Sequence, residues 1–323
     1  MVPNPVVYSL NQQHASGIRR LALDGKTLRG TLAHAAPDQR SQHLVSLYET
    51  QTGVVLAQQA VPDKGNEISV EAALLTPMLV QGRIVTADAM HTQRTCCADI
   101  HRFGGYYVLL AKANQPTLEE DLRLFFSEPP LDCCDWRPAH TCSKGHGRVE
   151  RRELIASTEL NEWLAATWPG VEQVFCIQRT SSRQGQRHTQ TVYGITNLSP
   201  LQASAAQLLE LVRRHWTIEN RLHWRRDVTL GEDHCQVRTG EAPLVLAALN
   251  NVVLALFDFL GVRNVPRAAA PLRCSPSTGS PACAGFLADY QIALALHLLS
   301  DAFHGEWNYT ILPQPSRSSA QLI

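Results

Sequence analysis

The sequence predicts an α/β fold in which helices flank a mixed β-sheet and a β-rich insertion precedes the last helices of the core. Three observations lead to this prediction. Short apolar runs alternate with helical patterns in the first 116 residues. Residues 117–199 contain further strand-like runs, and residues 201–226 then carry a long helical pattern.

Composition indicates a soluble globular protein. The chain has 323 residues, of which 44% are hydrophobic and 18% charged, which favours a folded chain with a sizeable core. Lys+Arg and Asp+Glu both number 29, so any nucleic-acid binding must come from local basic patches. No basic-then-apolar segment follows Met1, so secretion is not expected. Polar residues interrupt the apolar run at 242–260, which predicts a core helix and no membrane partner.

The first part of the chain predicts five strands. Residues 18–23, 43–48 and 54–61 have strand patterns, and a hairpin-like connection with Gly53 joins the second run to the third, which predicts an antiparallel meander. A helical pattern at 69–80 follows, although Pro77 makes its last turn uncertain. The predicted elements then alternate, with a strand at 83–88, a helix at 92–103 and a strand at 106–110.

Two of these strands end in an acidic residue. The first runs into Asp24-Gly25-Lys26, a turn signal, and the fourth ends at Asp88. Three meandering strands followed by alternating helices and strands are typical of a ribonuclease H-like sheet. In such a sheet, carboxylates of the first and fourth strands meet one from a later helix, and Glu219 lies on the helix predicted at 201–226.

The surroundings of Glu219 allow three interpretations. Residues four apart share a helix face, so His215, Glu219 and His223 form a polar line. Nearby arginines would suit a polyanion; they stand at positions 213, 214, 221, 225 and 226. A solvated, salt-bridged face is the simplest alternative. The line His215-Glu219-His223 would also suit a zinc site in an unrelated hydrolase.

The insertion is predicted to be β-rich. Strand patterns cover residues 149–156, 171–178 and 191–196, and residues 179–188 are expected to form an exposed, mobile loop. The cysteines are expected to be reduced thiols, because none has the spacing of a zinc knuckle or redox motif. An irregular zinc cluster is an alternative, formed by Cys133, Cys134, His140, Cys142 and His146.

Three converging carboxylates favour a particular chemistry. Carboxylate oxygens bind hard divalent cations such as Mg²⁺ or Mn²⁺ and leave room for waters and a substrate phosphate. Two such ions roughly 4 Å apart activate an attacking oxygen and stabilise the leaving oxygen in phosphoryl displacement. Asp24, Asp88 and Glu219 therefore predict a nuclease or strand-transferase.

Several motifs in order resemble the DDE transposases of bacterial insertion sequences, specifically the ISAs type. The similarity runs from about Ile18 to Arg273. It rests on the segments Leu21-Ala-Leu-Asp24-Gly-Lys26-Thr-Leu-Arg29-Gly30, Ile84-Val-Thr-Ala-Asp88-Ala-Met, Tyr107-Val-Leu-Leu-Ala-Lys112-Ala-Asn114-Gln115-Pro116, Lys144-Gly-His-Gly-Arg148 and His215-Trp-Thr-Ile-Glu219-Asn-Arg-Leu-His223-Trp224.

This resemblance implies a ribonuclease H-like catalytic domain that binds two Mg²⁺ or Mn²⁺ ions through Asp24, Asp88 and Glu219. It further implies binding to the ends of the element and to target DNA, as a homodimer, in the nucleoid of the bacterial cytoplasm. DNA contacts near the cut are expected from His215 and Arg226. Residues expected to contact DNA or support the active site are Lys112, Asn114 and Gln115.

The predicted organisation follows from these elements. An irregular lead-in covers 1–17, core segments cover 18–116 and 200–262, the insertion covers 117–199, and an irregular tail covers 263–323. Only 23 residues precede Asp24, so the family's N-terminal region is expected to be largely missing. The predicted function is metal-dependent DNA cleavage and strand transfer. The alternative is a catalytically inactive, truncated remnant that binds DNA or a full-length transposase.

Overall fold

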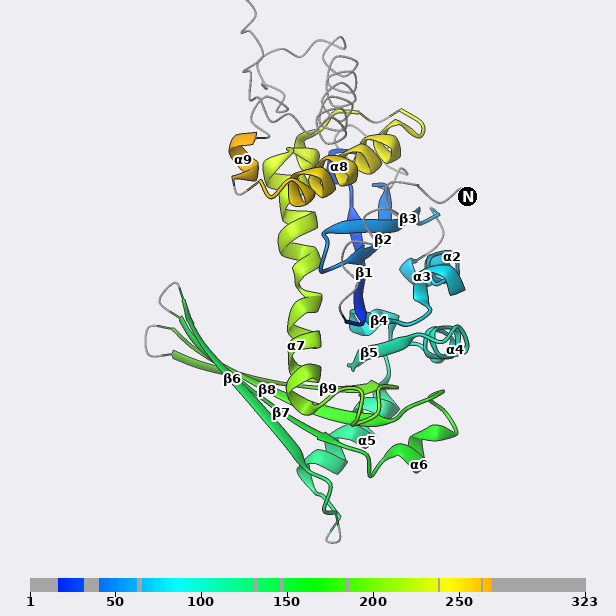
Figure 1. The fold of residues 1–323 in the computed structure, drawn as a ribbon, viewed down its shortest axis with the longest axis vertical. Helices are drawn as coiled ribbons and strands as arrows, with labels where there is room; N and C mark the ends of the chain where they lie inside the picture. The colour runs from blue at the N-terminus through cyan, green and yellow to red at the C-terminus, as the bar shows by residue number, and fades with distance from the viewer. Residues whose placement is uncertain are drawn as a thin grey trace, which may run out of the picture.

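The protein forms a mixed α/β structure around a large sheet (Figure 1), as predicted. The computed structural model describes residues 17–31, 41–62, 66–130, 133–145, 148–183, 186–237, 239–262 and 264–268. The predicted tail beyond residue 268, including its helix-like run, lies outside the described residues. Within these ranges nine strands join one sheet in the order β3-β2-β1-β4-β5-β9-β8-β7-β6.

The first five strands agree with the predicted ones to within a few residues. They are β1 (Arg19–Thr27), β2 (His43–Glu49), β3 (Val54–Ala60), β4 (Arg83–Ala87) and β5 (Tyr106–Ala111). The meander β1-β2-β3 is antiparallel, whereas β4 pairs with both β1 and β5 in parallel. The carboxyl ends of β1, β4 and β5 therefore lie at the same edge of the sheet.

Short helical segments connect these strands, and a longer helix follows β5. They are η1 (Arg29–Thr31), η2 (Glu67–Val70), α2 (Glu71–Leu74), α3 (Pro77–Val80), η3 (Ala89–His91), α4 (Arg94–Arg102) and α5 (Pro116–Ser127). The single helix predicted at 69–80 is wrong. Thr76 is extended (φ −91°, ψ 154°) and Pro77 begins α3, because a proline disfavours helical geometry in the residue before it.

The insertion extends the same sheet. Its elements are β6 (Arg137–Gly145), β7 (Arg148–Ser157), α6 (Asn161–Ala165), β8 (Gln173–Arg183) and β9 (Gln186–Thr196). Strand β9 pairs antiparallel with β5, from Val108 with Thr196 to Ala111 with Tyr193. The ends of β6, β7, β8 and β9 that lie away from β5 form an arm that projects from the rest of the protein (Figure 1).

Two predictions for the insertion need correction. Strand β6 was not predicted, and most of the loop predicted at 179–188 belongs to β8 and β9, where Arg179 pairs with Gln190. Side chains of β9 are exposed from Gln186 to Thr191. A strand that is polar on both faces has no hydrophobic period, so its sequence resembles that of a loop.

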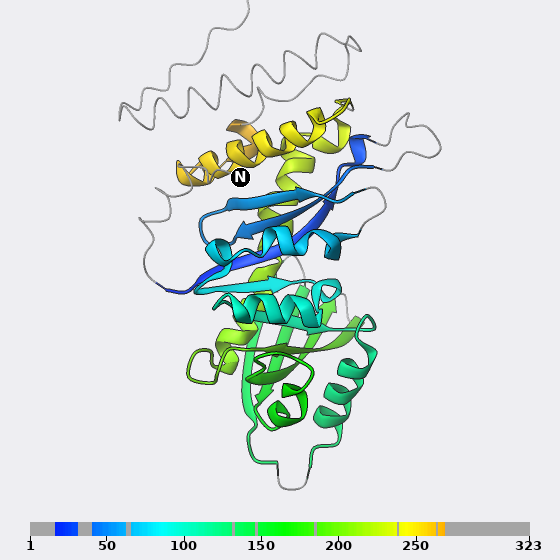
Figure 2. The ribbon, with the colours of Figure 1, turned by 90° about the vertical axis from the view of Figure 1, so that its right-hand side faces the viewer.

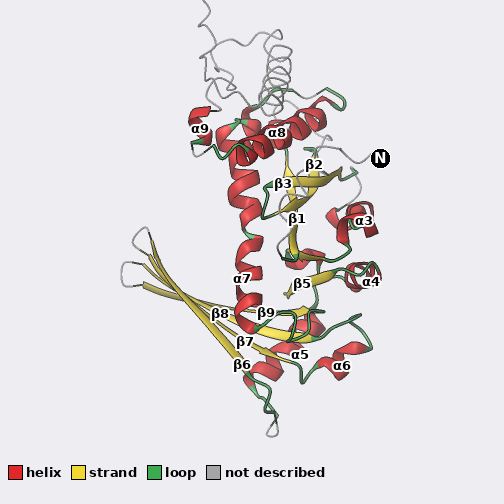
Figure 3. Cartoon of the chain, in the orientation of Figure 1, coloured by secondary structure: helices red, strands yellow, loops and turns green. Residues whose placement is uncertain are grey.

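The last helical region crosses the sheet. It contains α7 (Ala205–His215), η4 (Ile218–His223), η5 (Arg225–Thr229), η6 (Glu232–His234), α8 (Ala242–Phe259) and α9 (Val265–Ala268). Ser204 and Gln207 form a reciprocal capping box that starts α7. Helix α7 lies on one face of the sheet and α4 on the opposite face (Figures 1 and 3).

Apolar side chains bury both faces of the sheet. One cluster joins β1, β2, β4 and β5 to α2, α4 and α5, and a second joins β4, β5, β7 and β8 to α7. A third cluster joins Ala22 and Tyr48 to η4 and α8. Figure 2 shows α8 lying across the end of the molecule that holds β1–β3.

Helix α8 is the one helix among the described residues that is long and apolar enough to cross a membrane. This is weak evidence, because the core helix of a soluble protein meets the same two criteria. Of the helix, 44% is buried inside the protein, and its contacts are mainly with β3.

Candidate active site

The alternation of β1 determines where Asp24 points. Leu21 and Leu23 belong to the cluster on the α4 side of the sheet, whereas Ala22 packs against Ile218 of η4. Successive side chains of a strand point to opposite faces, so Asp24 shares the face of Ala22. The carboxylate therefore points toward the helix that carries Glu219.

Strand pairing brings Asp88 beside Asp24. Leu23 of β1 is the direct partner of Ala87 of β4 in the parallel ladder, and each is followed by an aspartate. Thr86 faces the α7 side, since its hydroxyl contacts His215. Asp88 lies on this side too, with Oδ1 3.8 Å from Nε2 of His215. Its side chain is 45% exposed.

The third carboxylate comes from a π-helical segment. Trp224 donates its backbone N–H to the carbonyl of Glu219, five residues earlier, instead of the four of an α-helix. Such π-helical turns occur often at functional sites. Glu219 is exposed, whereas His223, four residues later, is buried.

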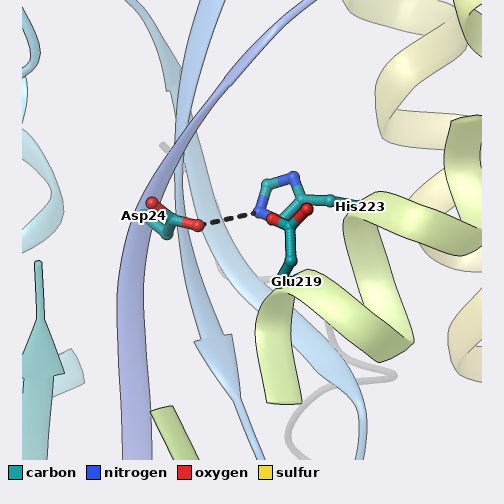
Figure 4. A group of neighbouring side chains, drawn as sticks. All are labelled: Asp24, Glu219 and His223. Atoms are coloured by element: carbon teal, nitrogen blue, oxygen red, sulfur yellow. Dashed lines mark ion pairs between the residues drawn. The ribbon is translucent and has the colours of Figure 1, made fainter. Parts of the chain in front are cut away.

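Asp24, Glu219 and His223 converge (Figure 4). One ligand atom from each lies within 4.8 Å of the others, and Nε2 of His223 is 3.5 Å from Oδ2 of Asp24. Among the described residues, this is the group of three or more acidic, histidine or cysteine side chains that could hold a metal ion. Asp88 lies beside the group but outside it.

The electrostatics of Asp24 fit a cation. Burial, followed by the charges of Asp88, Glu67 and Glu219, raises the pKa of Asp24 to about 7, although a hydrogen bond from the N–H of Gly25 opposes the shift. Without a cation, the ionised carboxylates repel one another. A divalent ion would remove this repulsion, so the residues present fit an oxygen-liganded metal.

Both histidines of the helix are neutral at physiological pH. Burial lowers the pKa of His215 to about 4, although Asp88 opposes the shift. Burial, followed by the charges of Arg226 and Lys26, lowers the pKa of His223 to about 3. A neutral imidazole keeps one nitrogen lone pair free for a ligand.

A buried ionic network that the sequence analysis missed supports the site. Glu67 binds Nε2 of His43 at 2.7 Å and Nε2 of His91 at 3.0 Å, and Nδ1 of His91 bonds to Glu71. A Cβ atom on Gly25 would lie 2.2 Å from the Glu67 carboxylate. Only a glycine after Asp24 therefore allows Glu67 this position.

Hydrogen bonds within this network favour the charged forms of His91 and Glu67, although burial favours the neutral forms. Burial alone would lower the pKa of His91, yet its hydrogen bonds to Glu67 and Glu71 raise it to about 9. Burial alone would likewise raise the pKa of Glu67, yet hydrogen bonds from His43 and His91 lower it to about 2. His91 ends η3, the turn that begins after Asp88, and its N–H donates to the Asp88 carbonyl.

A second network lies deeper in the protein. Nζ of Lys26 bonds to Asp227 and lies 4.0 Å from Glu232 and 3.9 Å from Asp233. Burial raises the pKa of Asp227, although Lys26 opposes the shift. In sequence these acids belong to a polar connection, and nothing in their spacing indicates that they surround Lys26.

Arg226, which was predicted to contact DNA, faces the protein interior in this structure. Its side chain is fully buried, and Nε binds both oxygens of Glu232, at 3.1 and 2.9 Å. Nη1 reaches Gln58 and Asn251 at 3.3 Å. His215 is also buried, with 8% of its side chain exposed, which leaves it little surface for DNA. It lies against Asp88 instead.

The motif after β5 lies close to Asp88. Lys112 is exposed, and its charge acts on His215. Asn114 donates from Nδ2 to the carbonyl of Ala89 at 2.5 Å. Gln115 donates to the side chain of Gln93 at 3.0 Å. Asn114 thus fastens the turn that follows Asp88.

The two zinc alternatives differ from the observed geometry. Asp24, and not His215, joins Glu219 and His223 in the group that could hold a metal. The cysteine cluster around Cys133 forms no such group within the described residues, although His146 lies outside them.

Known proteins resemble this chain over most of its length. The family model described as Transposase DDE domain matches residues 15–256. The "Putative protein YbfL" and the "H repeat-associated putative transposase YhhI", both of Escherichia coli K12, are each 29% identical over 243 residues, covering 72% of this chain and 62% of the relative. The "Uncharacterized protein in dhlA 3'region" of Xanthobacter autotrophicus is 33% identical over 169 residues, covering 52% and 56%.

These matches define how far the similarity extends. The chain spans about 62% of the length of the two Escherichia coli relatives. A solved structure, the sugar N-methyltransferase KedS8 of Streptoalloteichus, aligns over 41% of this chain and 46% of its own, with 14% identity and a TM-score of 0.18, which is too low to support any inference. The family match, which covers the site described above, is the informative one: the chain belongs to the DDE transposase family.

Proposed function

We propose that this chain is the catalytic part of a DNA transposase, with a ribonuclease H-like core, that cleaves DNA strands and joins them to a target. The observation that carries the proposal is that ligand atoms of Asp24 and Glu219 lie within 4.8 Å of each other, with Asp88 at the end of the strand beside β1. Asp24 and Asp88 follow paired residues of adjacent parallel strands, and the charge of Glu219 acts on Asp24.

The oxygen ligands of the site indicate which metal ion it would bind. Asp24, Asp88 and Glu219 would hold Mg²⁺ or Mn²⁺, two ions in the complete complex, because these ions take oxygen ligands and keep open positions for phosphate. The ions would supply an activated water or hydroxyl and neutralise charge on the scissile phosphate. The raised pKa of Asp24 supports this assignment, since it reflects carboxylates close together and partly buried.

The remaining site residues have separate roles in this proposal. His215 positions Asp88, which it contacts from its buried place on α7. Asn114 holds the turn after Asp88 through the carbonyl of Ala89, and Gln115 holds Gln93, which follows that turn. Lys112, which is exposed, would contact a DNA phosphate.

The partners follow from the reaction. Joining both ends of an element to one target requires two cleaved ends in one complex, so we expect two copies of the chain on DNA. The substrates are the ends of the element and the target DNA, and the place of action is the nucleoid. These assignments extend to the whole transposase and rest on the family.

Metal binding followed by strand cleavage tests the proposal. Calorimetry should detect Mn²⁺ binding that Asp24→Ala and Glu219→Ala both weaken. Supercoiled plasmid should be nicked by the wild-type chain in Mn²⁺ and not by Asp88→Ala, whose circular dichroism should match the wild type. Glu120→Ala, an exposed change on α5, is the matched control and should leave nicking intact.

Two results would contradict it. Nicking that survives Asp88→Ala would remove the carboxylate site from the reaction. Salt-sensitive DNA binding without cleavage, under any divalent metal, would instead favour a catalytically inactive remnant that competes for DNA.

A further inference from the structure

His223 has an unusual environment for a histidine. Its side chain is 4% exposed, and neither ring nitrogen has a hydrogen-bond partner among the residues that the structure describes. A buried polar group without a partner is unfavourable and uncommon in native proteins. The ring is therefore placed for an interaction that the protein chain does not itself provide.

The direction of the ring shows where that interaction lies. Figure 4 shows His223 and Glu219 projecting from the same helical segment toward Asp24 on β1. The 3.5 Å between Nε2 of His223 and Oδ2 of Asp24 exceeds the length of an ordinary N–H···O bond, about 2.7–3.2 Å. The two atoms face each other across a gap.

We propose that His223 supplies a nitrogen ligand, together with oxygen ligands from Asp24 and Glu219, to one divalent ion, and that this ligand makes the site prefer Mn²⁺ to Mg²⁺. The inference deepens the proposed function and rests on it, because it assigns a fourth protein ligand to a site otherwise made of carboxylates. Asp88 remains on the exposed side of the same site.

The spacing of the three side chains fits one ion. Donor atoms bound at about 2.1 Å to an octahedral ion lie about 3 Å from their neighbours. The 3.5 Å between Nε2 of His223 and Oδ2 of Asp24 is close to this spacing, and the ligand atoms of all three side chains lie within 4.8 Å of one another. One ion bound between them would require the side chains to close the remaining distance.

The imidazole nitrogen of His223 is the reason to expect Mn²⁺ rather than Mg²⁺. Mg²⁺ prefers oxygen ligands and gives up water reluctantly. Imidazole favours first-row transition ions, whose affinities rise from Mn²⁺ onward. A site with two carboxylates and one imidazole should therefore favour Mn²⁺ over Mg²⁺ more strongly than a site of carboxylates alone.

Pulsed electron paramagnetic resonance on the full chain loaded with Mn²⁺ tests the assignment. Nitrogen bound directly to Mn²⁺ should appear as a hyperfine coupling that changes on labelling histidine with ¹⁵N. His223→Asn should abolish the coupling, and His215→Asn, a buried histidine of the same helical region outside the group, should retain it. The ratio of Mn²⁺ to Mg²⁺ affinity should fall about tenfold in His223→Asp.

The outcomes separate this inference from the proposed function. Mn²⁺ bound to the wild-type chain in an Asp24-dependent manner, but without histidine coupling, would overturn the role of His223 and leave the carboxylate site standing. A folded wild-type chain that binds no Mn²⁺ would overturn both. The wild-type spectrum itself can refute the assignment, so the test does not depend on whether His223→Asn folds.

Discussion

Leu23 on β1 pairs directly with Ala87 on the parallel strand β4, and the next residue of each strand is an aspartate. Asp24 lies inside β1, where it also pairs with Ser46 of β2, and Asp88 follows the end of the neighbouring strand β4. Asp24 faces the helical segment that carries Glu219 (Figure 4). Burial and the neighbouring charges raise the pKa of Asp24 to about 7. The metal-free protein therefore contains an electrostatic repulsion, and its size can be measured.

Asp24→Asn should stabilise the metal-free chain at pH 8. The folded-state pKa of Asp24 lies above its ordinary value of 3.8, so the folded state binds the proton more tightly and the free energy of unfolding falls as pH rises from about 4 to about 7. Removing the charge should increase the free energy of unfolding by roughly 1–3 kcal/mol at pH 8. Below pH 4 the variant and the wild type should have the same free energy of unfolding, because Asp24 is then protonated in both the folded and the unfolded state.

Urea unfolding from pH 4 to pH 8 measures this difference. Asp99→Asn serves as the control, since it changes an aspartate in a surface ion pair and should alter stability by less than about 1 kcal/mol. A destabilised Asp24→Asn chain at pH 8 would show that this aspartate has no unfavourable charge in the folded state.

His91 gives a second dependence on pH. Its folded-state pKa, about 9, lies above the ordinary 6.5, so its stabilisation is fully present below pH 6.5 and is lost as pH rises through 9. His91→Gln should lower the free energy of unfolding by about 3–5 kcal/mol at pH 6, because it leaves Glu67 and Glu71 buried without the charged imidazole. Above pH 9 the difference from wild type should shrink.

Thermal unfolding at pH 6 and pH 10 tests the role of His91. The exposed His140 on β6 offers the matched change, and His140→Gln should leave the unfolding temperature unaltered at both pH values. A constant loss for His91→Gln across this range would mean that its ring is neutral in the folded protein.

The sequence predicted the first five strands because their signals are local. Each is an apolar run bounded by turn residues, and only four residues connect β2 to β3. The pairing of β9 with β5 could not be predicted, because it joins residues nearly 90 apart and leaves no local pattern. The exposed end of β9, from Gln186 to Thr191, is polar on both faces, so it has no hydrophobic period from which a strand could be predicted.

The site was predicted in part. Asp24, Asp88 and Glu219 were identified by the elements that carry them, and whether they bind metal stays a prediction. The partner of Arg226 is Glu232, and this ion pair depends on the turn through η5 and η6 rather than on any helical spacing. Glu67 was missed because its partners, His43 and His91, come from separate elements.

Lys112 and Asn114 should separate DNA binding from active-site support. Lys112→Ala removes an exposed cation, so it should weaken DNA binding for all sequences and lower the dependence of affinity on salt by about one counterion. Asn114→Ala removes the hydrogen bond to Ala89 and should slow cleavage while leaving DNA affinity unchanged. Fluorescence anisotropy at several salt concentrations and plasmid nicking measure the two effects. Equal loss of affinity in both variants would contradict this division.

Arg226 tests whether the arginines of the last helical region share one role. Arg226→Met should reduce the free energy of unfolding by about 3–5 kcal/mol, because it leaves Glu232 buried without its partner. The double change Arg226→Met, Glu232→Leu should recover part of this loss, since it removes the uncompensated charge. Arg213 is exposed on α7, and Arg213→Ala should alter stability by less than about 0.5 kcal/mol.

DNA affinity of the same variants completes the comparison. Because the Arg226 guanidinium is buried against a glutamate, folded Arg226→Met should bind DNA with the salt dependence of the wild type. Arg213→Ala should lower that dependence if the exposed Arg213 binds a phosphate. If Arg226→Met keeps its stability but its salt dependence falls by about one counterion, the Arg226 side chain must leave Glu232 for the phosphate backbone when DNA binds. The resemblance-based prediction would then describe the DNA complex correctly.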